Sequence, residues 1–435
     1  MILTAPSKRI QGVLHSPAWA LVAAFGTYFC MYGFRKPYTA ATYSPAFFWG
    51  FDYKILLVLA QTLGYVAAKW LGIKIVSEIK PNQRIKLLSA LILVAELMLL
   101  FFGLIPPPWS IFCLLLNGLS LGIIFGLVLG FLEGRKNSEM LIAGLCASFI
   151  VADGVTKSVG KWLLDLGMME NWMPFMAGLV FLVPTVIFIS MLAFVPPPSQ
   201  TDVECRSVRV PMLASARWEF FIKYAPGLVA IVLIYLLVTL LRSVRADFAP
   251  EIWKGLGYPQ TPALFTQSEL LVSFAVTVIN GLVIFILNHY RAFRFSLVTC
   301  FSGFILILAA VWGLRMGLGD FPFMVLVGFG LYTPYVAIHT TIFERLIAIT
   351  KEKANIGFLM YLADAAGYTG YIILMLLRFL TPPGESIFFL FIRLCIYLGC
   401  AGGLIVLFCS WYFKWKFKNN EQYHTPFSTG QSGAV

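Results

Sequence analysis

The chain has 435 residues, of which 60% are hydrophobic and only 12% are charged. Soluble globular domains carry about 25% charged residues, so the composition excludes an ordinary soluble protein and indicates one that crosses a membrane many times. The net charge of +12 does not indicate nucleic-acid binding. The excess lysines and arginines lie in short loops on one side of the membrane, as the positive-inside rule predicts.

Apolar windows long enough to cross a bilayer as a helix, about 20 residues, recur along the whole chain. There are twelve, at residues 17–36, 53–74, 86–105, 109–132, 140–163, 174–195, 225–246, 266–288, 295–315, 321–344, 355–380 and 386–413. One long polar insert separates the first six from the last six. We therefore expect an all-α membrane protein with 12 transmembrane helices in two pseudo-symmetric six-helix bundles. The expected parts are an N-terminal bundle 1–196, a cytoplasmic linker 197–224, a C-terminal bundle 225–413 and a cytoplasmic tail 414–435.

Every second loop along the chain contains lysines or arginines, and the loops between these basic loops are short or acidic. Pairs such as Arg291 and Arg294 lie on the side that we assign to the cytoplasm. The first window is not followed by a small-residue cleavage site, so we expect it to be retained as a span. We expect a monomeric, multi-pass protein of the cell membrane, here the bacterial inner membrane, with both termini cytoplasmic.

Sequence signatures of catalysis are few and unconvincing. The eight cysteines form no Cys-x-x-Cys pair, the four histidines are scattered, and no phosphate-binding loop occurs. The pattern from Gly118 to Gly122 matches a hydrolase nucleophile elbow, but it lies within an apolar window instead of between a strand and a helix. The same run has a glycine at every fourth residue from Gly118 to Gly134, which predicts a smooth packing face. We expect no enzyme activity, cofactor or metal.

Basic residues end two of the windows in equivalent positions. Arg35 and Lys36 close the first window, and Arg242 closes the seventh. Either Arg35 extends toward the headgroups, or Pro37 breaks the helix and leaves Arg35 facing inward. Asp247 is expected to neutralise Arg242 or its neighbour Arg245.

Other ionisable residues lie deeper in the windows, where each must be paired, hydrated or near an end. Tyr65 and Lys69 share one face of the second window, which faces either a cavity or, for Lys69, the cytoplasmic surface. Asp153 and Lys157 are four residues apart, so they form an internal ion pair or face a cavity separately. Two further candidates for proton coupling, His339 and Asp364, lie in the tenth and eleventh windows.

The candidate cavity cations outnumber the anions. The candidate anions are two carboxylates, Asp153 and Asp364. The candidate cations are five: Arg35, Lys36, Lys69, Lys157 and Arg242. An anionic substrate is therefore favoured, and the planar guanidinium fork suits phosphate or carboxylate oxygens. We expect one arginine from each bundle to hold a single anion.

Five stretches in order along the chain resemble the major facilitator superfamily, and within it the organophosphate:phosphate antiporters. They are Tyr-Gly-Phe-Arg-Lys-Pro-Tyr at 32–38, Leu-Gly-Tyr-Val-Ala-Ala-Lys at 63–69, Leu-Asn-Gly at 116–118, Leu-Leu-Arg with the following Asp and Pro at 240–250, and Gly-Phe-Gly-Leu-Tyr-Thr-Pro at 328–334. The resemblance implies that Arg35 and Arg242 bind the substrate phosphate and that Lys69 lies near the site. It also implies alternating access and exchange for inorganic phosphate.

The sequence departs from that family in two places. The loop at 77–84 is a degenerate form of the superfamily's Asp-Arg-x-Gly-Arg, and the fifth span has Asp153 and Lys157 where the antiporters have a histidine. Two alternatives therefore stay open. One is a proton-coupled symporter of another small solute that uses Asp153 or Asp364 as the proton carrier, and the other is a transporter-like ligand sensor. The expected partners are a small anionic metabolite, inorganic phosphate or protons, and the lipid bilayer, without nucleic acid.

Overall fold

The structure of the chain, a computed structural model, describes residues 16–43, 47–79, 81–132, 135, 138–197, 214–258, 261–350, 356–378 and 386–418. Most of the expected linker, 198–213, and most of the expected tail, 419–435, lie outside these residues. The described chain is almost entirely helical. Its one small sheet is an antiparallel hairpin of β1 (Phe47–Phe48) and β2 (Phe51–Asp52).

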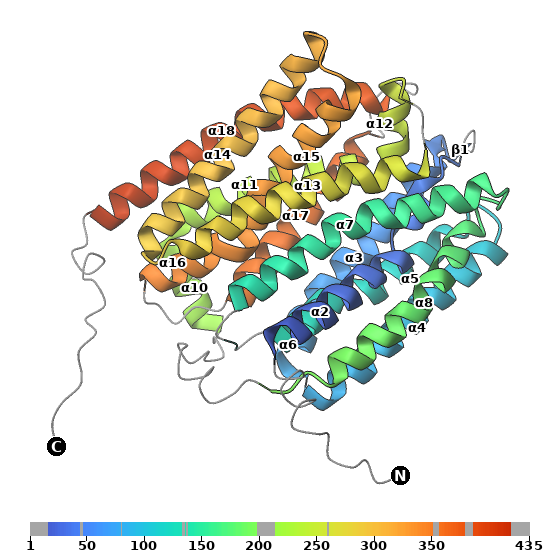
Figure 1. Ribbon diagram of the computed structural model, residues 1–435, viewed down its shortest axis with the longest axis horizontal. Coiled ribbons are helices and arrows are strands. Elements are labelled where there is room, and N and C mark those ends of the chain that lie inside the picture. Colours follow the sequence, from blue (N-terminus) through green and yellow to red (C-terminus); the bar gives the residue numbers. More distant parts are fainter. Residues whose placement is uncertain are drawn as a thin grey trace.

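The first half of the chain forms one group of long helices (Figure 1). A short α2 begins with the N-cap Ser16, whose hydroxyl accepts a hydrogen bond from the Trp19 amide. The elements are α2 (Pro17–Met31), the 3-10 turns η1 (Tyr32–Phe34) and η2 (Pro37–Ala40), α3 (Tyr53–Glu78), α4 (Pro81–Leu104), α5 (Ile111–Leu121), α6 (Ile124–Leu132), α7 (Ser138–Asp165) and α8 (Met173–Ala193).

The second half forms a second group of helices beside the first (Figure 1). Its elements are α10 (Ala214–Lys223), α11 (Ala225–Asp247), α12 (Ala249–Gly255), α13 (Pro262–Leu282), η3 (Val283–Phe285), α14 (His289–Arg315), α15 (Asp320–Ala337), the π-helical turn η4 (Ile338–Ile342), α16 (Phe343–Thr350), α17 (Ile356–Arg378) and α18 (Ile387–Lys418). The two groups meet where α7 packs along α13 and where α3 packs along α17.

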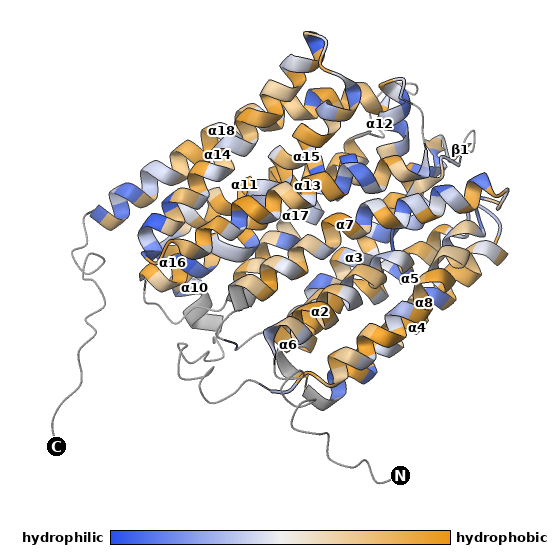
Figure 2. Ribbon diagram, viewed as in Figure 1, coloured by the Kyte–Doolittle hydropathy of each residue, from blue (hydrophilic) through white to orange (hydrophobic). Residues whose placement is uncertain are grey.

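Eleven segments of the described chain are long and apolar enough to cross a membrane. They match eleven of the twelve expected windows. The twelfth crossing is α2, whose 15 residues continue through η1. In Figure 2 apolar residues cover most of the outer helices α4 and α8, whereas polar residues gather at helix ends such as the C-terminal end of α18. This distribution is typical of a protein that lies in a bilayer.

Three windows differ in detail from the expected continuous helices. The first helix ends at Met31, so Pro37 begins a separate 3-10 turn and Arg35 lies between two turns. The fourth span is divided between α5 and α6. The tenth span changes at Ile338 into a π-helical turn before α16. The α-helix therefore ends before Pro37, and the side chain of Arg35 is buried instead of extending toward the headgroups.

Glycines on α5 allow a very close approach to α3. A Cβ atom at Gly118 would lie 2.1 Å from the carbonyl oxygen of Gln61, and one at Gly122 would lie 2.7 Å from the carbonyl oxygen of Tyr65. The glycine face predicted for the fourth span therefore contacts α3 at these two positions. Farther along, Gly130 contacts the guanidinium of Arg84 instead of a helix backbone. Gly134 lies outside the described residues.

Candidate functional site

The non-helical segment after α2 is held in place by two amide side chains. Gln61 on α3 donates a hydrogen bond to the carbonyl oxygen of Arg35 at 2.9 Å. Asn117 on α5 donates to the carbonyl oxygen of Phe34 at 3.0 Å and accepts from Gln61. Backbone carbonyls that leave a helix inside a membrane need such donors, because no lipid group can supply them. The position of Arg35 is thereby fixed from two neighbouring helices.

Two arginines and two tyrosines form a row across the boundary between the halves. The guanidinium of Arg35 lies 3.8 Å from the centre of the Tyr65 ring. Tyr65 contacts Tyr368 of α17 edge to face, with ring centres 5.0 Å apart. The hydroxyl of Tyr368 accepts a hydrogen bond from Arg242 at 2.9 Å. Cation–π contacts of this kind stabilise a buried arginine without neutralising its charge.

A small tyrosine-lined cavity, the central chamber, adjoins this row and draws on both halves. It is lined by Tyr28, Tyr32, Tyr65, Lys69, Phe125, Phe149, Tyr335, His339, Asp364 and Tyr368. Arg35 and Arg242 do not line it themselves. Instead, each contacts rings that do: Arg35 lies over Tyr32 and Tyr65, and Arg242 over Tyr335 and Tyr368. The chamber has space for about one water molecule, so the structure represents a closed state.

One wall of the central chamber is a polar network centred on Asp364. Lys69 donates to its Oδ2 at 2.7 Å, and the hydroxyl of Tyr235 on α11 donates to its Oδ1. Nε2 of His339 lies 2.8 Å from the same hydroxyl, and His339 belongs to the π-helical turn η4. Turns of this kind occur frequently at functional sites. Lys69 and Asp364 come from different halves, so their ion pair also joins α3 to α17.

Most buried cations in the described chain have a carboxylate partner. The ion pairs are Lys36–Asp247, Lys54–Glu251 at 2.6 Å, Lys69–Asp364 at 2.7 Å, Lys157–Asp153 and Arg245–Glu269 at 2.5 Å. Within the same residues, Arg35 and Arg242 have none. Two atoms of the Arg35 guanidinium, Nε and Nη1, and the Nε of Arg242 are buried without a hydrogen-bond partner. Unpaired buried charge at membrane depth is costly and marks functional positions.

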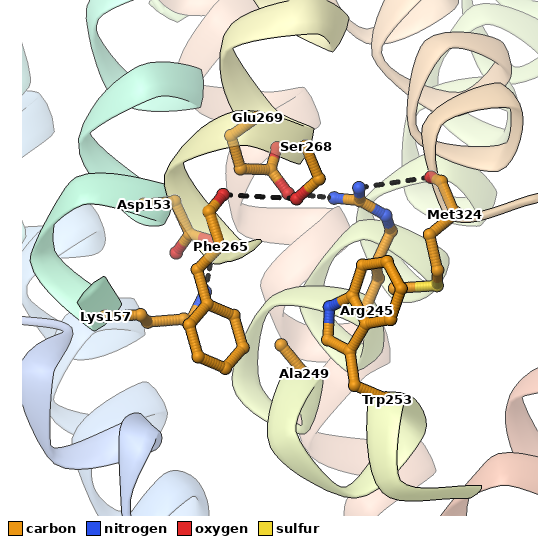
Figure 3. A pocket seen from close by; sticks show the side chains of 10 residues that line it. Asp153, Lys157, Arg245, Ala249, Trp253, Phe265, Ser268, Glu269 and Met324 are labelled. Atoms are coloured by element: carbon orange, nitrogen blue, oxygen red, sulfur yellow. Dashed lines mark hydrogen bonds and ion pairs between the residues drawn. The ribbon is translucent and has the colours of Figure 1, made fainter. Parts of the chain in front are cut away.

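A second cavity, which shares no lining residue with the central chamber, contains four charged residues (Figure 3). Asp153 and Lys157 of α7 form an ion pair within their own helix, and Arg245 of α11 bonds Glu269 of α13. Arg245 also donates to the carbonyl oxygen of Met324 at 3.2 Å. The internal pair that we considered for Asp153 and Lys157 is therefore present, and both residues also line a cavity. We call this group the charged quartet.

The structure thus divides the predicted site residues among three places. Tyr65, Lys69, His339 and Asp364 line the central chamber, with Arg35 and Arg242 behind its rings. Lys157 and Asp153 lie in the charged quartet. Lys36 pairs with Asp247. The expectation that Asp247 neutralises an arginine was wrong, because the short segment after α2 brings Lys36 to Asp247 and Arg245 turns to Glu269.

Sequence reasoning missed Glu269 and Glu96. Each is a single carboxylate within an apolar window, the same signal that identified Asp364. Glu269 pairs with Arg245, whereas both oxygens of Glu96 on α4 are buried without a partner in the described chain. The aromatic residues Tyr235 and Tyr368 were missed too, because a tyrosine in an apolar run carries no signal of its own. In the part of the chain that the structure describes, no group of three His, Cys, Asp or Glu could hold a metal ion.

Comparisons with known proteins agree with this architecture. The model of a family of unknown function, DUF5690, matches residues 37–416. The crystal structure of a D-xylose–proton symporter is similar, with a TM-score of 0.62 and 13% identity over 94% of this chain and 98% of that one. A bacterial homologue of the iron transporter ferroportin, in an outward-facing state with soaked iron, has a TM-score of 0.55 and 16% identity over 90% and 98%. No curated protein matches the sequence. These likenesses confirm the predicted all-α membrane fold of the major facilitator type.

Proposed function

We propose, on the premise that this chain belongs to the DUF5690 family and has the major facilitator fold, that it is a secondary transporter of a small anionic metabolite. The substrate carries a phosphate or carboxylate group, and inorganic phosphate is its exchange partner. The solved structures that the chain resembles are transporters by their own descriptions, a D-xylose–proton symporter and a homologue of an iron transporter. At 13% and 16% identity that likeness concerns the fold, so the substrate class rests on the site itself.

The single observation that carries the proposal is the pair of buried, unpaired arginines. Arg35 comes from the first half and Arg242 from the second, and the rings of Tyr65 and Tyr368 lie between them. An anion that separates these two rings would lie between two guanidinium groups. Each could then donate two parallel hydrogen bonds to phosphate or carboxylate oxygens. The bound anion would supply the negative charge that the described chain does not give to these residues.

Alternating access requires that contacts between the halves form and break. In the described chain three ion pairs join the halves: Lys36 to Asp247, Lys54 to Glu251, and Lys69 to Asp364. The third lies in the central chamber, where an anionic group could displace Asp364 from Lys69. We propose that the substrate competes for Lys69 in this way, so that its binding loosens one contact between the halves. Sites at the repeat interface near the bilayer midplane are usual for this architecture.

The placement of the protein in the cell follows from the loop charges and stays a proposal. We place the chain in the cell membrane with both termini cytoplasmic, and we assign 1–196 and 225–413 to the two bundles. The helices before and after the polar insert form two groups in Figure 1, which supports this division.

Substitution of either arginine by lysine tests the proposal. We expect Arg35→Lys and Arg242→Lys each to abolish counterflow of inorganic phosphate by the purified protein in liposomes, because an ammonium group lacks the planar fork. The thermal unfolding midpoint of each variant in detergent should stay near that of the wild type. Inorganic phosphate should raise the midpoint of the wild type only, since a ligand that binds the folded state stabilises it.

Arg315→Lys at the exposed end of α14 makes the same chemical change away from the site and is the matched control. It should transport like the wild type. Near-native phosphate counterflow by both site variants would contradict the proposal. Stabilisation by phosphate or by phosphorylated or carboxylated metabolites, without any flux, would favour a ligand sensor instead.

A further inference from the structure

The charged quartet lies at the boundary between the halves and has no role in holding the proposed anion. Its cavity is formed by α7 from the first half and by α11, α12, α13 and α15 from the second (Figure 3). The four charges sum to zero, since Lys157 balances Asp153 and Arg245 balances Glu269. Both ion pairs are internal to their own half, so they do not join the halves. If these charges served only to hold the halves together, each ion pair would join a residue of one half to a residue of the other.

Each carboxylate of the charged quartet uses only one of its two oxygens. Oδ2 of Asp153 accepts from Lys157, and Oε1 of Glu269 accepts from Arg245. Oδ1 of Asp153 and Oε2 of Glu269 are buried and have no hydrogen-bond partner among the described residues. A buried acceptor without a donor destabilises the folded protein, and a charged acceptor does so more strongly. The described residues therefore leave these two oxygens without a donor, although Lys157 and Arg245 line the same cavity.

Two glycines make room for these charged groups. A Cβ atom at Gly154, next to Asp153, would lie 2.8 Å from both Cβ and Cγ of Glu269. A Cβ atom at Gly328 on α15 would lie 2.8 Å from Nη2 of Arg245. Any larger residue at either position would push the carboxylate or the guanidinium aside. The glycine at 154 also brings Glu269 of one half against the helix that carries Asp153 of the other.

We propose that Asp153 and Glu269 together bind one proton, and that this proton couples transport to the proton gradient. The inference rests on the proposed transport function and adds its coupling ion. A hydronium ion gives the proton to one of the two free oxygens, and water leaves. The new O–H group then donates to the other carboxylate, directly or through one water molecule, for which the cavity has about enough space.

A proton fits this cavity better than a metal cation does. Hard cations such as Ca²⁺ take six to eight oxygen ligands, whereas the charged quartet offers two free carboxylate oxygens. Lys157 and Arg245 line the same cavity and would repel a metal ion. A proton needs only one oxygen and one acceptor. Two neighbouring carboxylates commonly share a proton, because their like charges oppose full ionisation.

Few other ionisable groups act on the two carboxylates. Tyr332 of α15 is within electrostatic range of both Glu269 and Asp153, and Cys395 of α18 is within range of Arg245. Lys36 lies within range of both Asp153 and Lys157, and Asp247 lies within range of Lys157. With the proton bound, the charged quartet has a net charge of +1. An anion held by Arg35 and Arg242 would offset that charge, so joint movement of anion and proton is electrostatically favourable.

The position between α7 and α13 also gives the proton alternating access. When the halves separate on one side, water reaches the two carboxylates and each ion pair stays with its own half. When they close, the proton is enclosed between the helices. The same motion that exposes the central chamber therefore exposes the proton site.

Infrared spectroscopy of the full-length protein in lipid tests the site without any substrate. The carbonyl band of protonated carboxyl groups is followed from about pH 8 to about pH 5.5, above the ordinary range of exposed Asp and Glu. Glu96 is also buried without a partner in the described chain and contributes a band in every variant, so the wild type should gain additional band amplitude that Glu269→Gln and Asp153→Asn each lack. Asp165 pairs with Lys161 at the same spacing on the same helix but is 43% exposed, so Asp165→Asn should keep the additional amplitude. The same additional amplitude in both site variants would overturn the proposal.

A further variant keeps the test informative if the Asn or Gln variants fail to fold. Glu269→Asp keeps the carboxyl group on a shorter side chain, so the additional amplitude should persist with a shifted midpoint. A midpoint identical to that of the wild type would count against a role for Glu269. Each variant should elute as a single peak on gel filtration.

Phosphate flux then separates this inference from the proposed function. In liposomes with an inward proton gradient, the wild type should accumulate inorganic phosphate, and replacing sodium by potassium should change nothing. Glu269→Gln should lose this accumulation but keep phosphate counterflow. Accumulation that persists in Glu269→Gln, or that follows a sodium gradient, would overturn the coupling role. If the wild type shows no phosphate flux at all, the proposed phosphate transport is rejected. The infrared band still tests whether Asp153 and Glu269 bind a proton.

Discussion

Lys36 and Asp247 form a buried ion pair that includes a third residue. The hydroxyl of Tyr371 donates to the second oxygen of Asp247 at 2.9 Å. Removing one partner of a buried pair leaves an uncompensated charge, at a cost of about 3–5 kcal/mol. We expect Lys36→Met to lower the thermal unfolding midpoint strongly.

The combination of Lys36→Met with Asp247→Asn removes both charges and is expected to recover most of the loss. Differential scanning fluorimetry of the purified proteins measures both effects. A double variant as unstable as Lys36→Met alone would show that the ion pair is not the cause.

Single residues also show the limits of sequence reasoning. The ionisable character of Arg35, Arg242 and Asp364 within apolar windows was visible in the sequence. The partner of Asp364 was not visible, because Lys69 and Asp364 are 295 residues apart and meet only through folding. Glu269 could have been found by the rule that identified Asp364, although its role depends on Arg245 of another helix.

The contact between α3 and α5 is the element whose packing depends most directly on glycine. A Cβ atom at Gly64 would lie 1.9 Å from the carbonyl oxygen of Leu115, which cannot move without displacing the helix. We expect Gly64→Ala to lower the unfolding midpoint and to reduce phosphate transport, because α3 carries Tyr65 and Lys69. Overpacking of this kind costs about 1–3 kcal/mol or more.

Gly281 on α13 is the matched control, since nothing lies within 4 Å of a Cβ atom there. Gly281→Ala should leave the unfolding midpoint and transport nearly unchanged. Equal loss in both variants would point to helix propensity, and not to the contact with α5.

At the level of elements, apolar length predicted the spans well. Length alone could not reveal where a span changes its geometry. The first helix ends at Met31 because the chain turns twice before Ala41, and the amides of Gln61 and Asn117 that support this turn come from other helices. The π-helical turn at His339 likewise has no simple sequence signal.

In our proposal the two halves of the molecule move relative to each other, and α7 separates from α13. Ser158 and Thr266 lie opposite each other on these helices, with their hydroxyl oxygens 2.6 Å apart. Cysteines at both positions would place their sulfur atoms close together, as a disulfide needs. We expect Ser158→Cys with Thr266→Cys to form a disulfide on oxidation and to stop phosphate transport, and a reductant should restore it.

A protease site inserted into 198–213 would separate the halves on a non-reducing gel unless the disulfide holds them. Ser158→Cys alone is the control and should transport under both conditions. Full transport by the oxidised double variant would refute the proposed separation of α7 and α13.

The division into two halves was predicted from the polar insert and the paired windows and stays a prediction. The fold is confirmed by the solved structures that the chain resembles. The closed state was not anticipated, since a sequence does not specify which of several conformations predominates. A chamber between the halves was expected from charge alone, whereas its tyrosine wall depends on five rings from five different elements.

The contact between Tyr65 and Tyr368 has a bearing on the cell that carries this protein. Because these rings touch across the boundary between the halves, they interrupt any water-filled path through the centre of the molecule. We therefore expect the protein without substrate to conduct no ions. Large amounts of it can then be present in the membrane without lowering the membrane potential.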